Sequence, residues 1–201
     1  MTTNISKPKT SKPRGRPRRF DPEQAVATAQ RLFHAAGYDA VSVADVTEAL
    51  GINPPSFYAA FGSKAGLYAR ILDRYAQTGA IPLAEILRAD RPVSEALAAL
   101  LEAAARYYAA DPVATGCLVT EGIRCNDPEA RNAAGVFYVA AVGNIRGYIA
   151  DRHPDEADSM ADFIATVMAG LSAKAREGYG LDRLLEVARI AGRGLAEVLP
   201  G

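Results

Sequence analysis

The sequence is short of several residue types, and each shortage narrows the classes of protein to which it can belong. Its 201 residues include only two cysteines, Cys117 and Cys125, too few for a disulfide framework in a chain of this length. The two cysteines are eight positions apart, so they do not form the Cys-x-x-Cys pair typical of a zinc site. The N-terminus lacks the apolar stretch of a secretory signal, and no run of about 18 apolar residues predicts a membrane span. We therefore expect a cytoplasmic protein without a membrane partner.

Groups of residues suited to catalysis are also scarce. The chain has two histidines, His34 and His153, and neither lies near a Ser, Cys or acidic cluster at catalytic spacing. We expect both histidines to be ordinary surface or core residues, and the protein to be neither an enzyme nor dependent on a cofactor. Thiolates of Cys117 and Cys125 would suit the soft ion Cu(I), but no third ligand is evident. The favoured interpretation is two reduced thiols and no metal site.

What the chain does contain is a strong asymmetry of charge. Its formal net charge is zero, yet residues 1–19 hold seven of the 23 Lys and Arg residues and none of the 23 Asp and Glu residues. The first 19 residues therefore carry +7 and the remainder carries −7. Because residues 1–19 are also poor in apolar side chains, they cannot offset the entropy of ordering, and we expect a disordered basic arm. Such an arm on an acidic body is typical of proteins that bind nucleic acid.

Closely spaced helix signals follow the arm. Residues suited to the N-cap position stand at Asp21, Ser42, Asn53 and Ser63. With the glycines that follow, they predict helices over about 22–36, 43–50 and 54–61, and a fourth helix that starts at Lys64. Two short helices joined by a glycine-containing turn are typical of a helix-turn-helix, whose second helix enters the DNA major groove. An ordinary corner between two helices of a bundle is the alternative.

The remainder of the chain also has helical periodicity. Apolar residues recur at helical spacing through the segments 93–111, 127–153, 155–180 and 181–199, and the segment 114–126 predicts a shorter helix. No alternation typical of strands and no long repeat is evident. We predict an all-α fold of about nine helices, divided into the arm (1–19), a helix-turn-helix domain (20–66) and a helical ligand-binding and dimerisation domain (67–201).

Five short pieces between residues 20 and 75 identify a family when taken together. They are A-x-x-L-F-x-x-x-G-Y (29–38), S-V-A-D-V (42–46), A-L-G (49–51), S-F-Y-x-x-F (56–61) and S-K-x-x-L (63–67). This combination resembles the DNA-binding domain of TetR-type transcriptional regulators. Further along, GCLVTEGI, MAGLSAKAREG and LLEVARIA resemble the subgroup close to the copper-responsive repressor of the outer-membrane protein ComC.

The resemblance implies contacts with the DNA backbone. Tyr58 stands where the family places a tyrosine on the backbone, and Lys64 would hold a phosphate at the start of the fourth helix. Ser42 and Thr47 are the expected phosphate contacts from the bracing helix.

The resemblance also implies which residues of the second helix face the bases. These are Asn53, Pro54, Pro55, Ser56 and Ala59. Because a proline has no N–H group and no polar tip, direct readout would depend on Asn53, Ser56 and apolar contacts with thymine methyl groups. The two aromatic residues on the other side of this helix, at positions 57 and 61, are expected to pack into the core.

The arm contains the sequence KPRGRP, which matches the core of an AT-hook. Arg14 and Arg16 are expected to enter the narrow minor groove of A·T-rich DNA, and Arg18 and Arg19 to add DNA contacts beside them. The alternative is a non-specific tether to phosphates, whose affinity would fall steeply with salt.

The C-terminal domain is expected to bind a small molecule and a second copy of the chain. An apolar pocket between its helices is one interpretation of a group of aromatic and sulfur-containing residues, and simple core packing is the other. The residues are Tyr107, Tyr108, Cys117, Phe137, Tyr138 and Met168. The last two helices, about Ala157–Glu177 and Leu181–Val198, are apolar over too wide an arc for one small core. They carry small residues, such as Ala161, Ala165 and Gly192, that permit close approach, and we expect them to form a homodimer interface.

These expectations together predict a ligand-responsive transcriptional regulator. It would bind double-stranded DNA as a dimer at a pseudo-palindromic operator and act as a repressor that a small effector releases. An architectural DNA-binding protein without an effector, or an activator, is the alternative.

Overall fold

The computed structural model describes residues 21–199, and within that range the chain is helical with no strand. The all-α fold class is therefore confirmed. The helices are α1 (Pro22–Ala36), α2 (Val43–Leu50), α3 (Pro54–Phe61), α4 (Lys64–Thr78), α5 (Leu83–Ile86), α6 (Val93–Tyr108), α7 (Leu118–Gly122), α8 (Pro128–Ala150), α9 (Ala157–Arg176) and α10 (Leu181–Val198). The helix beyond the expected nine is α5, a single turn of four residues. The predicted basic arm, with Arg14, Arg16, Arg18 and Arg19, lies outside the described residues.

The first four helices begin at the predicted N-cap residues. The Asp21 carboxylate accepts from two N–H groups of the first turn of α1, and Ser42 forms a reciprocal capping box with Asp45. The Asn53 Oδ1 accepts from the Ser56 N–H at 2.9 Å, and the Ser63 hydroxyl caps α4 in the same way. These caps satisfy N–H groups that have no partner inside the helix. The predicted starts of the first four helices are therefore confirmed.

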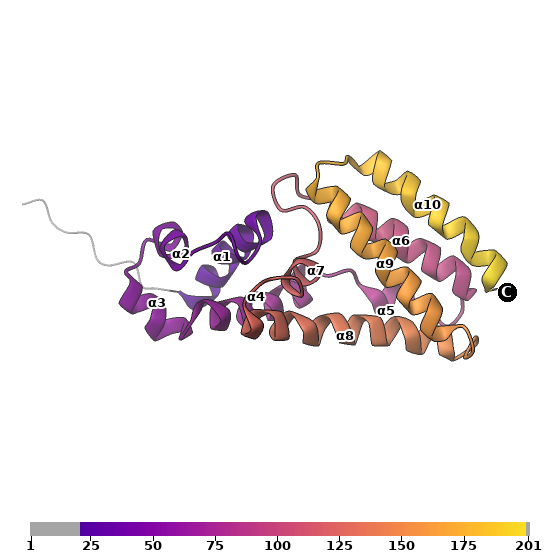
Figure 1. Ribbon diagram of the computed structural model, residues 1–201, viewed down its shortest axis with the longest axis horizontal. Helices are drawn as coiled ribbons and strands as arrows, with labels where there is room; N and C mark the ends of the chain where they lie inside the picture. The colour runs from indigo at the N-terminus through magenta and orange to yellow at the C-terminus, as the bar shows by residue number, and fades with distance from the viewer. Residues whose placement is uncertain (1–20, 200–201) are drawn as a thin grey trace, which may run out of the picture.

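The core consists of two clusters of buried side chains. One joins α1–α4, α7 and the start of α8, and includes Phe33 and Phe57. The other joins α6, α9, α10 and the C-terminal half of α8, and includes Leu100 and Ile164. Figure 1 shows the result, with α1–α3 at one end of an elongated molecule, α6, α9 and α10 at the other, and the long α8 running beneath α9. Cys117 packs against both clusters, so it lies where the two halves meet.

Three of the small residues in the last two helices, Ala161, Ala165 and Gly192, face other parts of the same chain. A Cβ atom on Gly192 would lie 3.1 Å from the Cβ of Ala98, so the glycine lets α10 lie close against α6. Ala161 is fully buried, and Ala165 lines a cavity described below. The outward faces of these helices instead carry larger apolar side chains.

Helix α8 is long and apolar. An 18-residue window in it has a mean hydropathy of 1.2, so by length and composition alone it is able to cross a membrane. A single helix of this kind is weak support for a membrane span, because core helices of other folds meet the same criterion. In the described structure α8 packs against α4, α7 and α9.

Candidate DNA-reading helix, junction and cavity

Helix α3 has one buried face and one exposed face. Phe57 is fully buried and Phe61 is almost so, and both pack into the first core cluster as expected. Tyr58, by contrast, is 52% exposed. The five residues expected to face the bases are all exposed: Asn53, Pro54, Pro55, Ser56 and Ala59. The two buried phenylalanines therefore fix the helix in the domain while its reading face stays open to a partner.

Lys64 lies beside this face at the start of α4. Its Nζ sits 4.0 Å from the centre of the Tyr38 ring, a cation–π contact that directs the half-buried side chain. The Tyr38 hydroxyl in turn donates to the Asp127 carboxylate at 2.6 Å. That hydrogen bond lowers the pKa of Asp127. Lys64 is thus held in place by a chain of contacts that reaches α8.

The two residues expected to contact phosphates from α2 differ in their surroundings. Ser42 is exposed, and its hydroxyl is engaged with Asp45 in the cap of α2. Thr47 is only 7% exposed, and its hydroxyl donates to the carbonyl of Ala44 at 2.9 Å. The structure therefore does not present Thr47 as a surface contact. Helical rotation turns it toward the core, next to the buried Val46.

A junction built around the segment 115–117 connects α1 to α9 and the rest of the molecule. The ring Nε2 of His34, on α1, lies 3.1 Å from the Gly116 carbonyl oxygen. Arg176, the last residue of α9, donates to the carbonyl oxygens of His34 at 2.9 Å and Thr115 at 3.2 Å. Its guanidinium Nε also lies 3.6 Å from the Glu121 carboxylate. A cation at the C-terminal end of α1 is favoured by the unpaired carbonyls and helix dipole there.

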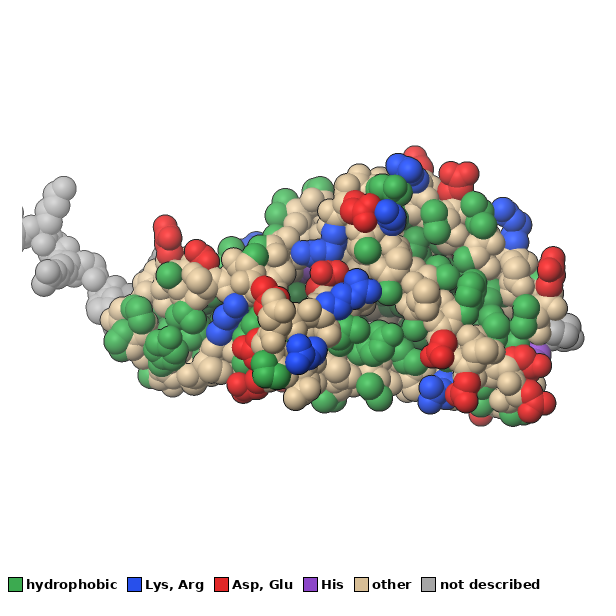
Figure 2. Space-filling model, viewed as in Figure 1, with side chains coloured by type: hydrophobic (Ala, Val, Ile, Leu, Met, Phe, Trp, Pro, Cys, Tyr) green, Lys and Arg blue, Asp and Glu red, His purple; other side chains and the backbone are tan. Residues whose placement is uncertain are grey.

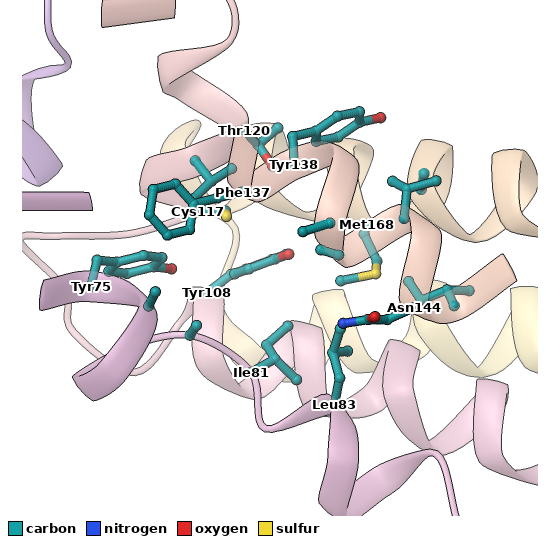
Figure 3. Close-up of a pocket in the computed structure, with 18 residues that line it drawn as sticks. Tyr75, Ile81, Leu83, Tyr108, Cys117, Thr120, Phe137, Tyr138, Asn144 and Met168 are labelled. Atoms are coloured by element: carbon teal, nitrogen blue, oxygen red, sulfur yellow. The ribbon is translucent and has the colours of Figure 1, made fainter. Parts of the chain in front are cut away.

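The same segment forms part of a cavity wall. The Cys117 N–H donates to the Ser172 hydroxyl of α9 at 2.9 Å, while the Cys117 side chain lines a cavity of about 260 Å³. Figure 3 shows Tyr75 and Tyr108 with their hydroxyls directed into the space between the labelled residues. One segment therefore touches α1 through Gly116, α9 through the Cys117 backbone, and the cavity through the Cys117 side chain.

Five of the six residues expected to form a pocket line this cavity: Tyr108, Cys117, Phe137, Tyr138 and Met168. Tyr107 does not. It is 42% exposed and belongs to a shallow surface groove along α6. Adjacent residues of a helix point about 100° apart, so only one of the two tyrosines is able to face the cavity.

The remaining polar residues singled out in the sequence form no metal site in the described part of the chain. No group of three or more His, Cys, Asp or Glu side chains gathers within residues 21–199. The Cys125 thiol donates to the Asp127 carbonyl oxygen, and burial raises its pKa. Just after the end of α8, the His153 N–H donates to the Ile149 carbonyl oxygen. His34, expected to be an ordinary residue, is instead part of the junction.

The outward faces of α9 and α10 carry exposed apolar side chains. Phe163 on α9 is 40% exposed, and Val187, Ile190 and Val198 on α10 are 43%, 55% and 49% exposed. Figure 2 shows hydrophobic side chains on the face formed by these two helices. Gly170 on α9 is also exposed and meets open space.

Comparison with known proteins places this arrangement in a family. The sequence model described as "Bacterial regulatory proteins, tetR family" matches residues 25–71, which contain α2, α3 and most of α1. The HTH-type transcriptional repressor BdcR of Escherichia coli (strain K12) is 56% identical over 191 residues, or 95% of this chain and 97% of that protein. The chain belongs to the TetR family.

Other members of the TetR family support the assignment over nearly the whole length. The HTH-type transcriptional repressor ComR of the same strain is 30% identical over 188 residues, which cover 88% of this chain and 90% of that protein. A structure of the TetR family transcriptional regulator CifR with 26-bp operator DNA matches with a TM-score of 0.78 and 34% identity. It covers 89% of this chain and 98% of that chain. The chain is thus a helix-turn-helix transcriptional regulator.

Proposed function

We propose that this TetR-family regulator is a repressor that binds a pseudo-palindromic operator as a homodimer and leaves it when a small effector binds. The observation that carries the proposal is the two-faced α3, with exposed Asn53, Ser56 and Tyr58 above buried Phe57. A relative of 56% identity is named a transcriptional repressor, and a solved relative of 34% identity is in complex with operator DNA. The protein acts in the cytoplasm, where bacterial DNA lies.

The charge distribution supports a role for the arm in DNA binding. Residues 21–66 hold two Lys or Arg residues, Arg31 and Lys64, against five Asp or Glu residues. The helix-turn-helix domain is therefore net negative, and DNA repels net negative charge. The arm of +7 in residues 1–19 reverses this balance. In this proposal Arg14 and Arg16 add minor-groove contacts beside each half-site, and Arg18 and Arg19 contact the backbone.

The exposed apolar face of α9 and α10 supports dimerisation. A two-fold dimer would cover Phe163, Val187 and Ile190 with the same residues of the second copy. The two copies of α3 would then face successive major grooves, about one helical turn or roughly 34 Å apart.

The junction supports a route from the cavity to the DNA. An effector that displaces the Cys117 side chain would shift the segment 115–117, whose carbonyl groups contact His34 and Arg176. Because His34 is on α1, the displacement would reorient the helix-turn-helix and change the spacing of the two copies of α3. The effector must bind the displaced state more tightly, typically by about 1–3 kcal/mol of coupling.

The function is tested by separating the two roles of Asn53, which caps α3 and would read DNA. Asn53→Asp keeps a capping oxygen but places a negative charge on the reading face. We expect this variant to unfold at the same urea concentration as wild type and to lose operator binding in a gel-shift assay. Asn53→Ala is the matched control for loss of the cap. If Asn53→Asp binds operator DNA as wild type does, α3 is not the reading helix.

A further inference from the structure

The cavity beside Cys117 lacks charged side chains among the described residues that line it. Eighteen residues from α4, α5, α6, α7, α8, α9 and the segments between them form the wall, and none is Lys, Arg, His, Asp or Glu. A charged group moved from water into such a site would lose its hydration without gaining a counter-ion, which carries a large cost in free energy. With one thiol and no carboxylate or imidazole, the wall also lacks the ligand set of a metal ion. The chemistry of the wall therefore favours a neutral occupant.

Two tyrosine hydroxyls of the wall lie near Cys117. The hydroxyls of Tyr75 and Tyr108 lie on the same stretch of the wall as the Cys117 thiol and point into the cavity (Figure 3). Burial raises the pKa of each tyrosine, so both hydroxyls stay protonated and able to donate. A thiol is only a weak acceptor. Tyr108, which is 3% exposed, therefore presents a strong donor to the cavity, with only a weak acceptor beside it.

The other end of the cavity is mostly apolar, with the Asn144 amide as a polar group beside Leu83 (Figure 3). Ile81, Leu83, Val142, Ile145 and Met168 line it, and Figure 3 shows Ile81, Leu83 and Met168 around the same space as the Tyr108 hydroxyl. The volume of about 260 Å³ lies just below the range of about 300–1,000 Å³ typical of sites for drug-sized ligands. The occupant must therefore be small, with an apolar body.

We infer that the cavity binds a small neutral molecule whose apolar body packs against Ile81, Leu83 and Met168 and whose acceptor oxygen, that of a ketone, aldehyde, ester or ether, accepts a hydrogen bond from the Tyr108 hydroxyl. This inference rests on the proposed function, because it names the class of effector for the same cavity. The position of Tyr108 beside Cys117 places the oxygen of the ligand next to the junction. A ligand bonded to Tyr108 would press on the Cys117 side chain, and the carbonyl of the preceding residue, Gly116, contacts His34 of α1.

The test is calorimetric binding of four probes of similar size to the full-length protein without DNA. Acetophenone is neutral and has an acceptor oxygen, ethylbenzene is neutral without one, benzoate is an anion and benzylamine is a cation. We expect acetophenone to bind at least tenfold more tightly than benzoate and benzylamine. We also expect it to bind about three- to tenfold more tightly than ethylbenzene, the range for one net hydrogen bond. Equal or tighter binding of either ion, or no binding of any neutral probe, would overturn the inference.

Two variants locate the probe. Tyr108→Phe removes only the hydroxyl, so it should abolish the advantage of acetophenone over ethylbenzene and leave ethylbenzene binding unchanged. Ala141→Leu adds volume inside the cavity and should weaken both neutral probes, with urea unfolding used to verify that the variant is folded. If the advantage of acetophenone persists in Tyr108→Phe, the assigned hydrogen bond is wrong.

Two outcomes would distinguish a failure of this inference from a failure of the proposed function. Selective binding of the neutral ketone that leaves operator affinity unchanged would support the class of ligand and contradict release by an effector. If benzoate releases the operator and no neutral probe binds, the proposed class of ligand is wrong but release by an effector is supported.

Discussion

His34 and Gly116 are 82 positions apart in the sequence, yet the His34 Nε2 lies 3.1 Å from the Gly116 carbonyl oxygen. The contact joins α1 of the DNA-binding half to the residue that precedes the cavity cysteine. Arg176 binds the same two segments through their backbone carbonyls. The DNA-binding half is therefore attached to the cavity wall by specific polar contacts as well as by core packing.

The first prediction concerns the pH dependence of stability. Burial lowers the pKa of His34 below its ordinary value of 6.5, and Arg176 adds to the shift, while the Gly116 carbonyl, Asp111 and Glu121 oppose it. The His34 ring therefore binds a proton more readily in the unfolded state than in the folded state, so protonation favours unfolding. The contribution of His34 to stability should be fully present above pH 6.5 and should be lost as the pH falls below 6.5 toward the lowered pKa. Urea unfolding of His34→Gln should show a weaker decline over this range than wild type, and His153→Gln should not. An equal decline in wild type and His34→Gln would contradict the assignment.

The second prediction uses two glycines with similar backbone angles. Gly116 and Gly178 both have positive φ, +79° and +90°, so alanine is strained at either position. A Cβ on Gly116 would also lie 2.9 Å from the Ser172 hydroxyl, whereas a Cβ on Gly178 meets nothing within 4 Å. We expect Gly178→Ala to cost about 1–2 kcal/mol of unfolding free energy. Gly116→Ala should cost about 1–3 kcal/mol more, because it also crowds the junction.

Urea unfolding of the two glycine variants measures this difference directly. A cost for Gly116→Ala no greater than that for Gly178→Ala would mean that the 115–117 segment moves freely. The proposed route from cavity to DNA would then lose its support.

A structural feature could be predicted from the sequence only where the residues that form it lie close together in the chain. The caps Asp21, Ser42, Asn53 and Ser63 act within three residues of themselves, so the helix boundaries could be predicted from the sequence. The contact of Arg176 with His34 spans 142 positions, and no local pattern indicates it. The junction could be found only once the fold had brought α1, α9 and the segment 115–117 together.

The sequence also does not show which of two neighbouring side chains faces the cavity. Tyr107 and Tyr108 are adjacent and equally aromatic, so composition indicated both, and only the rotation of α6 places Tyr108 at the cavity and Tyr107 outside it. Thr47 is a similar case on α2, where the hydroxyl that suits a phosphate donates instead to Ala44. The arm and its arginines lie outside the described residues, and their role stays a prediction.

The third prediction tests the proposed backbone contacts. Tyr58→Phe and Lys64→Gln should each weaken DNA binding several-fold and by similar factors for operator variants of different sequence. Lys64→Gln should also reduce the slope of log affinity against log salt by about 0.9 for each phosphate that the lysine neutralises. Because Lys64 packs over Tyr38, the unfolding free energy of this variant must be measured beside that of wild type. A loss limited to one base pair of the operator would instead assign that residue to base readout.

The fourth prediction concerns the basic arm. Deletion of residues 1–19 removes seven cations and leaves a helix-turn-helix domain of net negative charge, so affinity should fall and its salt dependence should flatten. Binding is to be measured by fluorescence anisotropy over a series of salt concentrations. A slope equal to that of the full-length chain would exclude a DNA-contacting arm.

A charge-conserving variant separates the two interpretations of the arm. Arg14→Lys with Arg16→Lys keeps the charge but replaces the planar guanidinium groups that suit a narrow minor groove. If the arm reads A·T-rich DNA, this variant should lose preference for A·T flanks while keeping the salt slope. If the arm is a phosphate tether, flank preference should be absent in wild type as well.

The central claim is that the chain binds operator DNA as a symmetric dimer through α3 and is released by an effector in the cavity. Footprinting on the DNA beside its own gene, with and without acetophenone and with a panel of metabolites and metals, tests it most directly. The account predicts a protected region with two-fold symmetry that requires Asn53 and is lost with a neutral small molecule. Protection without symmetry, protection that survives Asn53→Asp, or a protected region that no compound removes would contradict it.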